Sequence, residues 1–551
     1  MRQGLSRQYL MPAIRPATVL AVVLLCGVLC ADDQHHGTHD LGRVHFPVSC
    51  SAAAQNTFDR AIALLHSFSY NDAETTFSQI IHTEPDCAMA YWGVAMSLYH
   101  PVWEPPGATA LSKGAAAIAQ AKSAGAKTER ERDYIAVLAV FYTDTGNVSH
   151  RQRALAWRNA MQQLSMKYPE DPEAAIFFAL SLIATAPQGD KTYADQKRAA
   201  DILNRILPDQ PEHPGIAHYL IHSYDSPSLA ILALPAARSY ARIAPASPHA
   251  LHMPSHIFTR LGLWQESIDS NLASAAAARD HVAKSLLGGA SQDQLHAMDY
   301  LEYAYLQTCR DTEAKRIVDE AAAVSKLDQS VFQAAYALAA IPARYALERR
   351  RWSAAAELPV RPAWFPWAQF RFAEAITHFA RALGAARSGN PSKARAEIQH
   401  LADIRKALAQ TQQDYDWATQ VEVQRLTASA WLARAERRNQ EATASMRAAA
   451  DLEDRTGKHP VTPGPVLPAR ELLADLLMEL DRPALALPEF EKVLSNSPRR
   501  LNAIYGAGRA AELSGDRHRA AERYAELLQM CSQNGSTRLE ILNATAFLES
   551  R

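Results

Sequence analysis

Histidines are concentrated in one part of this sequence. Of its 20 histidines, eight fall within residues 213–296. His218 and His222 are four residues apart, which places both side chains on one face of a helix. His252 and His256 repeat that spacing further along the chain. Neutral imidazole is a common ligand of zinc, copper and nickel, so two such pairs on neighbouring helices can supply four nitrogen ligands.

These pairs belong to a longer polar face that we expect to line a concave ligand groove. Side chains separated by three, four and three residues share one face of a helix. Large apolar residues such as Leu220 and Phe258 fall on other faces, so the polar face is predicted to point into the groove. Asp225 or Asp299 can add a carboxylate to a metal site there. The predicted groove residues are His218, His222, Asp225, His249, His252, His256, His296, Asp299 and Tyr303.

Three interpretations of this face are open. The first is a groove that binds a peptide, a protein or a polar ligand through imidazoles. The second is a metal site or metal-dependent hydrolase whose ligands to zinc, copper or nickel are His218, His222, His252 and His256. The third is structural hydrogen bonding between helices. His66 and His100 have the same separation as His218 and His252, and this repetition favours the third interpretation over a metal site. We expect a binding protein more than an enzyme, because no general base or nucleophile accompanies the histidines.

The helices that carry these residues recur with a fixed period. Alanine followed by an aromatic residue at i+4 and an apolar residue at i+7 marks one face of a helix. Paired helices with a period of about 34 residues are typical of the tetratricopeptide repeat. The clearest copies, one such period apart, are Ala486, Phe490 and Val493 followed by Ala520, Tyr524 and Leu527. Since no segment alternates as a strand does, the sequence predicts an all-α fold, an α-solenoid of tetratricopeptide-like helix-turn-helix repeats.

Composition divides the chain into six expected segments. Proline and glycine are dense in 457–468, which therefore cannot be helical. The segments are 1–31, a signal peptide; 32–50, a polar histidine-containing spacer; 51–350, an N-terminal repeat array with the histidine-rich groove; 351–456, central helical repeats; 457–468, a connector; and 469–545, a C-terminal pair of repeats.

The N-terminus predicts export. Arg2, Arg7 and Arg15 precede the apolar run 17–31, which is shorter than the ~20 residues that span a bilayer. We expect this signal to be removed, which leaves a periplasmic or secreted protein without a membrane span. An uncleaved anchor is the alternative.

Export also bears on the cysteines, because disulfides persist in oxidising compartments. Cys50, Cys87, Cys309 and Cys531 remain after the signal, and four cysteines allow three pairings. Cys50 precedes the first predicted helix and Cys87 begins the third, so a Cys50–Cys87 disulfide is expected if those helices are neighbours. Separate buried thiols are the alternative, and the pairing of Cys309 and Cys531 is open.

Composition and missing motifs narrow the function further. The formal net charge of −1 gives no basic surface for nucleic acid, so we expect a protein or peptide partner. No HExxH, GxxxxGK[ST] or GxSxG motif occurs. The string GAGRAA at 506–511 imitates a dinucleotide-binding fingerprint, but it lies inside a predicted helical repeat with no strand before it.

Several long strings carry a family resemblance. The sequence resembles a family of exported bacterial tetratricopeptide-repeat proteins without an assigned activity, from about residue 45 nearly to the end. That resemblance implies a scaffold for protein interactions and no particular chemistry. The matching strings are ALLHSF (63–68), CAMAYWGVAM (87–96), HPGIAHYLIHSYD (213–225), PHALHMPSHIFTRLGLW (248–264) and KHPVTPGPVLPARELL (458–473).

Overall fold

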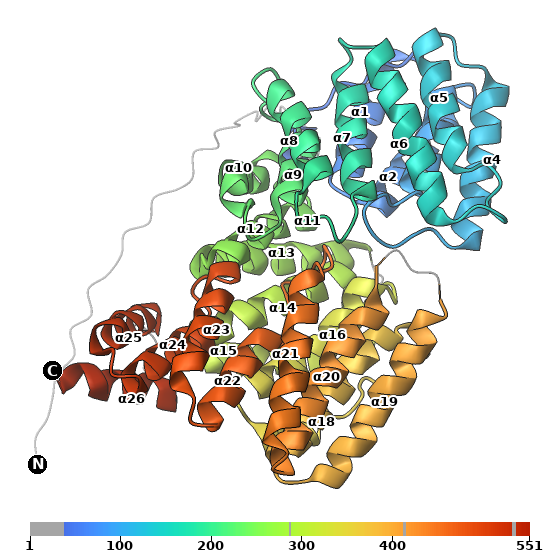
Figure 1. The fold of residues 1–551 in the computed structure, drawn as a ribbon. Coiled ribbons are helices and arrows are strands. Elements are labelled where there is room, and N and C mark those ends of the chain that lie inside the picture. The colour runs from blue at the N-terminus through green and yellow to red at the C-terminus, as the bar shows by residue number, and fades with distance from the viewer. Residues whose placement is uncertain (1–37, 286–287, 412–414, 532–535, 551) are drawn as a thin grey trace, which may run out of the picture. The chain divides into compact units, whose positions relative to one another are not determined.

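The computed structural model describes residues 38–285, 288–411, 415–531 and 536–550. Within these residues the regular elements are helices (Figure 1), and one isolated bridge joins Ala290 to Leu327. The predicted all-α fold is confirmed. The expected signal peptide, 1–31, lies outside the described residues. None of the helices that the structure describes is both long and apolar enough to cross a bilayer.

A first set of helices surrounds one apolar core that runs from Leu41 to Phe258. Two of its helices begin with a capping box, in which the cap side chain and the third helical residue exchange hydrogen bonds with each other's backbone; Thr128 and Ser149 are the caps. The helices are η1 (Thr38–Leu41), α1 (Ala52–His66), α2 (Tyr70–Thr83), α3 (Ala88–Ser97), α4 (Ala108–Ala124), α5 (Glu129–Phe141), α6 (His150–Lys167), α7 (Pro172–Thr185), α8 (Ala194–Ile206), α9 (Pro214–Tyr224), η2 (Ala230–Ala233), α10 (Leu234–Ile243), α11 (Pro248–His252) and α12 (Pro254–Leu261).

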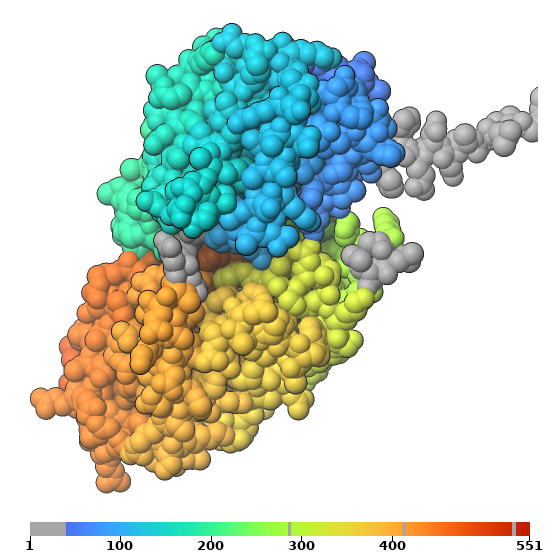
Figure 2. Space-filling model, turned by 90° about the vertical axis from the view of Figure 1, so that its right-hand side faces the viewer, coloured from blue at the N-terminus to red at the C-terminus, as the bar shows by residue number. Residues whose placement is uncertain are grey.

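A second set surrounds a separate core that runs from Trp264 to Phe547. The two cores divide inside the expected array 51–350 rather than at its end. Figure 2 shows the first set, blue to green, beside the yellow and orange helices of the second. The helices are α13 (Trp264–Ser285), α14 (Gln292–Gln307), α15 (Asp311–Ala322), α16 (Phe332–Glu348), α17 (Trp352–Ala356), η3 (Trp367–Gln369), α18 (Arg371–Arg387), α19 (Pro391–Ala409), α20 (Trp417–Ala435), α21 (Asn439–Arg455), α22 (Ala469–Glu479), α23 (Pro483–Asn496), α24 (Leu501–Leu513), α25 (Arg517–Cys531) and α26 (Leu539–Glu549).

The second set is a two-layered solenoid. Helices α14, α16, α18, α20, α22 and α24 each contact the next member of that series, so they form one continuous layer. The helices between them pack on both of their sequence neighbours and form the other layer. This arrangement is a tetratricopeptide-like α-solenoid of helix-turn-helix repeats, as the period of the sequence predicts.

Close helix contacts in the last repeats explain the periodic small residues. A Cβ added at Gly506 of α24 would lie 2.3 Å from the Phe490 ring of α23, and one at Gly508 would lie 2.7 Å from the Tyr524 ring of α25. Both aromatic side chains are fully buried. Each aromatic position of the repeat therefore packs where its neighbouring helix has no side chain.

The layer that begins with α14 closes on itself. At the start of α24, the Leu501 backbone N–H donates to Gln307 Oε1 of α14 at 2.8 Å. The Asn502 side chain donates to Glu348 Oε2 of α16 at 2.9 Å. The last repeats therefore return to the first helices of the series, at the C-terminal ends of α14 and α16.

The segment 32–50 is only partly what the sequence predicts. Phe46 is fully buried and packs its ring 5.4 Å from Phe58 and 5.5 Å from Trp92, between ring centroids. The later part of this segment therefore belongs to the first core, and its prediction as a polar spacer is wrong there. The connector 457–468 contains no helix, as its prolines and glycines require.

Two disulfides occur within the residues that the structure describes. Cys50 and Cys87 are bonded, with Cα atoms 5.4 Å apart. Cys309 and Cys531 form the other disulfide, with Cα atoms 5.5 Å apart and a sequence separation of 222. The first bond connects the segment before α1 to the start of α3, and the second connects the end of α14 to the end of α25.

Candidate metal centre

Six of the predicted histidines form one buried cluster. They come from four helices: His218 and His222 from α9, His249 and His252 from α11, His256 from α12, and His296 from α14. Pro254 separates α11 from α12, so the second pair spans a break between two short helices. We call these six residues the histidine cluster. Each has at most 9% of its surface exposed, and the expectation that they line an open groove is wrong for all but His222, which borders a cavity.

The first set within the cluster is His218, His222 and His249. His218 Nδ1 donates a hydrogen bond to the backbone carbonyl of His66 at 2.7 Å, so its Nε2 carries the lone pair. The Nε2 atoms of His222 and His249 both point at that Nε2, at 3.1 and 3.2 Å. One lone pair therefore faces two ring nitrogens.

The second set is His252, His256 and His296, and its geometry is more restrictive. His252 Nδ1 donates to Asn271 Oδ1 at 2.6 Å, and the Asn271 amide donates to the Ser267 carbonyl, which fixes which atom of Asn271 is the oxygen. His256 Nδ1 donates to Asp225 Oδ2 at 3.1 Å. Both Nε2 atoms are then unprotonated in neutral rings. These two lone-pair atoms face each other at 3.0 Å.

Burial opposes protonation of either ring. Burial lowers the pKa of His252 well below its usual value. Burial also lowers the pKa of His256, although its hydrogen bond with Asp225 opposes that effect. Neutral imidazoles are thus favoured, so each of the two rings presents a lone pair to the other. Buried histidine ligands whose other ring nitrogen donates to a carboxylate or carbonyl are the usual pattern of a metal site.

The two sets are adjacent. One ligand atom from each residue of the first set lies within 4.8 Å of the others, and the same holds for the second set. Between the sets, the ring centroids of His222 and His256 are 6.2 Å apart, and those of His249 and His252 are 6.3 Å apart. The rings therefore form one continuous group.

Another buried group of side chains, outside the histidine cluster, has different chemistry. His66 Nε2 and His213 Nε2 each donate to Glu173, both at 2.9 Å, and the Tyr219 hydroxyl lies 2.9 Å from His66 Nδ1. Burial raises the pKa of Glu173, but the neighbouring His66 and His213 outweigh it and hold that pKa far below its usual value. Each of these hydrogen bonds pairs a donor with an acceptor, so this cluster is a structural link among α1, α7 and α9.

Asp225 connects the histidine cluster to charged residues. Besides His256, its carboxylate accepts from Arg260 Nε at 2.9 Å and from Lys458 Nζ at 2.6 Å. Burial lowers the pKa of Lys458 to about 8, against the effect of Asp225. Lys458 lies at the start of the connector 457–468, which the sequence did not associate with the histidines.

The connector also packs over the second set. The Tyr300 ring of α14 stacks on His256, and its hydroxyl lies 3.3 Å from His256 Nε2. Because that hydroxyl donates its one proton to the Val461 carbonyl at 3.2 Å, it does not donate to His256. The Tyr336 hydroxyl of α16 donates to the Gly464 carbonyl at 3.2 Å. The connector therefore covers one side of the cluster.

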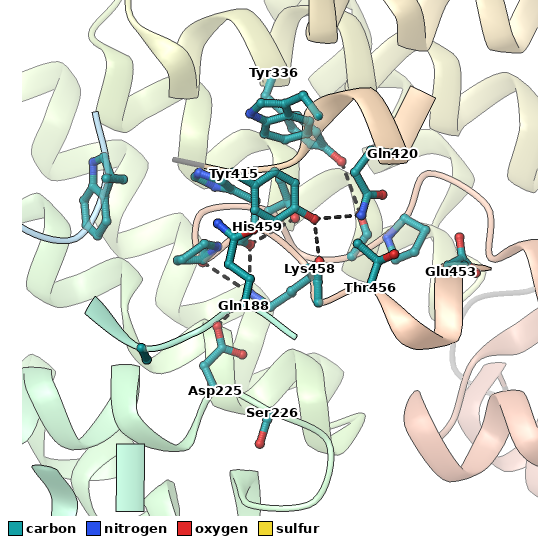
Figure 3. Close-up of a pocket in the computed structure, with 18 of the residues that line it drawn as sticks. Gln188, Asp225, Ser226, Tyr336, Tyr415, Gln420, Glu453, Thr456, Lys458 and His459 are labelled. Carbon is teal, nitrogen blue, oxygen red and sulfur yellow. Dashed lines mark hydrogen bonds and ion pairs between the residues drawn. The ribbon is translucent and has the colours of Figure 1, made fainter. Parts of the chain in front are cut away.

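A cavity of about 1380 Å³ adjoins the cluster at His222 and Asp225. Residues of both helix sets line it, and Figure 3 shows Asp225 and Lys458 pointing toward one another on one side of it, with Tyr336 and Tyr415 on another. Phe332 stacks on His459 at 4.3 Å between centroids, and this stack also lines the cavity. Of the predicted groove residues, His222 and Asp225 thus border an open space.

Two of the predicted groove residues do not join the cluster. Asp299 accepts from Arg344 Nη1 at 2.6 Å, and the Tyr303 hydroxyl accepts from Arg500 Nη1 at 3.1 Å. Both are buried in ion-pair networks that link α14 to later helices. Their positions on the helix face were predicted. Because they are paired with Arg344 and Arg500 from later helices, however, they stabilise the packing of α14 and do not line a groove.

Comparisons with known proteins leave the function open. No protein-family model matches the chain, and no curated protein matches it by sequence. Among solved structures, human IFIT1 in a dimer with m7Gppp-AAAA is 10% identical with a TM-score of 0.36, and the match covers 84% of this chain and 95% of that one. Yeast Tom70 is 10% identical with a TM-score of 0.27, covering 90% and 96%. The P58(IPK) TPR domain is 14% identical with a TM-score of 0.20, covering 69% and 99%. Likenesses this distant say nothing about a ligand.

Proposed function

We propose that this chain is a metal-binding α-solenoid whose histidine cluster holds zinc, copper or nickel. The observation that carries the proposal is the pair of unprotonated Nε2 atoms of His252 and His256, 3.0 Å apart and facing each other. A buried acceptor without a donor costs about 1–3 kcal/mol. A bound cation turns both lone pairs into ligands and removes that cost. Asn271 and Asp225 supply the outer hydrogen bonds that orient such ligands.

Metal analysis of the purified, tag-free chain tests this proposal. The protein is incubated separately with zinc, copper and nickel salts, loosely bound ions are removed by gel filtration, and the retained metal is counted by mass spectrometry. We expect retained metal in the natural chain and less of it in the variant His252→Ala/His256→Ala, which disrupts the second set and keeps the first. A variant lacking the exposed His45, His82 and His518 is the matched control and should retain its metal. No retained metal from any of the three salts would overturn the proposal.

We place the protein in an oxidising compartment, the periplasm or the exterior of a bacterial cell. The apolar N-terminal run, the resemblance to an exported family and two disulfides support this. The natively produced protein is alkylated without reductant and analysed by mass spectrometry. All four cysteines of the two disulfides, Cys50, Cys87, Cys309 and Cys531, should be protected from alkylation. Alkylated cysteines would contradict an oxidising location.

A peptide partner is a second candidate function, and the cavity favours it. Its volume of about 1380 Å³ exceeds that of common small-molecule sites, which are about 300–1,000 Å³. Its wall includes the stacked rings of Phe332 and His459, and of Phe372 and Trp417. Selection from a random peptide library should yield binders that Trp417→Ala weakens. Equal binding of an RNA oligonucleotide would contradict a preference for peptide.

A further inference from the structure

The number of nitrogens in the histidine cluster exceeds what one ion can use. His218, His252 and His256 each direct Nδ1 at a protein oxygen, so each of these rings offers only Nε2 to a metal. A tetrahedral ion takes four ligands. One ion would therefore leave two of the six histidines without it, inside a site where unpaired nitrogens are costly.

The histidines divide naturally into two groups of three. The first set and the second set each bring three ligand atoms within 4.8 Å of one another. Helix α11 supplies His249 to the first set and His252 to the second, so one short helix joins both sites. Two ions with three imidazoles each would use all six rings.

Charge decides which ions can lie side by side there. Both sets consist of neutral imidazoles, and neither contains a carboxylate or a thiolate. The adjoining carboxylate, Asp225, is already paired with two cations, Arg260 and Lys458. Two divalent ions would add four positive charges to a buried site with no anionic ligand, whereas two monovalent ions add two and repel each other four times less.

We infer that the histidine cluster holds two copper(I) ions, one in each set. This inference rests on the proposed function and specifies its ion and its number. Among the proposed metals, copper is the one with an accessible monovalent state, and imidazole is among its ligands. The adjacent cavity at His222 gives the first set a route to small molecules.

An anaerobic titration of the full chain with copper(I), in competition with a chromophoric copper(I) chelator, tests the inference. We expect two equivalents per chain to be withheld from the chelator. X-ray absorption of the loaded protein should show nitrogen scatterers and no sulfur at the copper. His222→Ala in the first set and His296→Ala in the second should each withhold one equivalent. His459→Phe, which keeps a ring in the same stack outside both sets, should withhold two.

The possible outcomes separate the inference from the proposed function. One equivalent of copper(I) in the natural chain would overturn the pair of ions and leave metal binding intact. Two tightly bound zinc ions with no retention of copper(I) would overturn the assignment to a monovalent metal. No retention of any of the metals would overturn both. The count in the natural chain decides the matter even if a variant fails to fold.

Discussion

Substitution of Asp225 by asparagine tests separately what this residue contributes to metal affinity and to the stability of the fold. The substitution keeps the shape of the side chain and an oxygen that can still accept from His256 Nδ1. It removes the negative charge between Arg260 and Lys458, whose side chains are only 14% and 11% exposed. Breaking a buried ion pair by removing one partner costs about 3–5 kcal/mol. We expect the lower end, about 3 kcal/mol, because burial already lowers the pKa of Lys458 to about 8 and that side chain can lose its proton.

The expected effect on metal affinity is independent of this loss. Removing a residue that orients a histidine ligand weakens metal binding about 10–100-fold. A charge-assisted hydrogen bond is roughly twice as strong as a neutral one. Since asparagine still accepts from His256, we expect about a 10-fold loss, or about 1.4 kcal/mol. Urea unfolding of the metal-free protein measures the stability, and chelator competition measures the affinity.

A matched variant identifies the source of each effect. Asp195 pairs with Arg158 through two bonds of 2.7 Å, and its side chain is 18% exposed. Asp195→Asn should lower stability without changing metal affinity. If Asp225→Asn behaves in the same way, then Asp225 only balances charge, and the argument that it orients a metal ligand through His256 is refuted.

Two further predictions concern the scaffold. Gly506→Ala places a Cβ 2.3 Å from the Phe490 ring. The resulting clash costs about 1–3 kcal/mol, which should exceed the helix-propensity gain of about 1 kcal/mol and lower the melting temperature. An unchanged melting temperature would contradict the repeat packing. Burial lowers the pKa of His378, but its interactions with Glu374, at ion-pair distance, and with Glu397, through a hydrogen bond, outweigh burial and raise that pKa above its usual value. The contribution of His378 to stability should therefore be full below about pH 6.5 and disappear as the pH rises through the raised pKa. The difference in urea midpoint between the natural chain and His378→Gln should shrink from pH 5.5 to pH 8.5. A constant difference would show that the charged His378 ring does not stabilise the folded protein.

The sequence predicted the fold because its signal is local and repeated. Alanine, an aromatic residue and an apolar residue at fixed spacing recur along the chain, and each copy specifies the same helix face. Phe490 and Tyr524 are buried against neighbouring helices as that pattern requires. The same pattern correctly placed His218 with His222 and His252 with His256.

The burial of the histidines and the residues that hydrogen-bond to them could not be predicted from this pattern. A helical period tells which side chains share a face, but not how tightly successive helices close around it. His252 depends on Asn271, 19 residues away on α13, and Asp225 depends on Lys458, 233 residues away. No spacing in the sequence connects these residues. The expectation of a groove was therefore wrong for all of the histidine cluster except His222, although the sequence predicted that these side chains lie together.

The burial of the histidine cluster changes what a loss of stability can mean. Had these side chains been exposed, a large drop in melting temperature on their replacement would have shown a structural role. Since they are buried, as His66 and His213 are, replacement should destabilise the protein whether or not it binds metal. The discriminating quantity is the rise in melting temperature on adding metal, because a ligand that binds only the folded state stabilises it by RT ln(1 + [L]/Kd). That rise should be smaller in His252→Ala/His256→Ala, which keeps only the first set, than in the natural chain. A rise of equal size in both proteins would mean that the ion binds elsewhere and that the facing nitrogens are not its ligands.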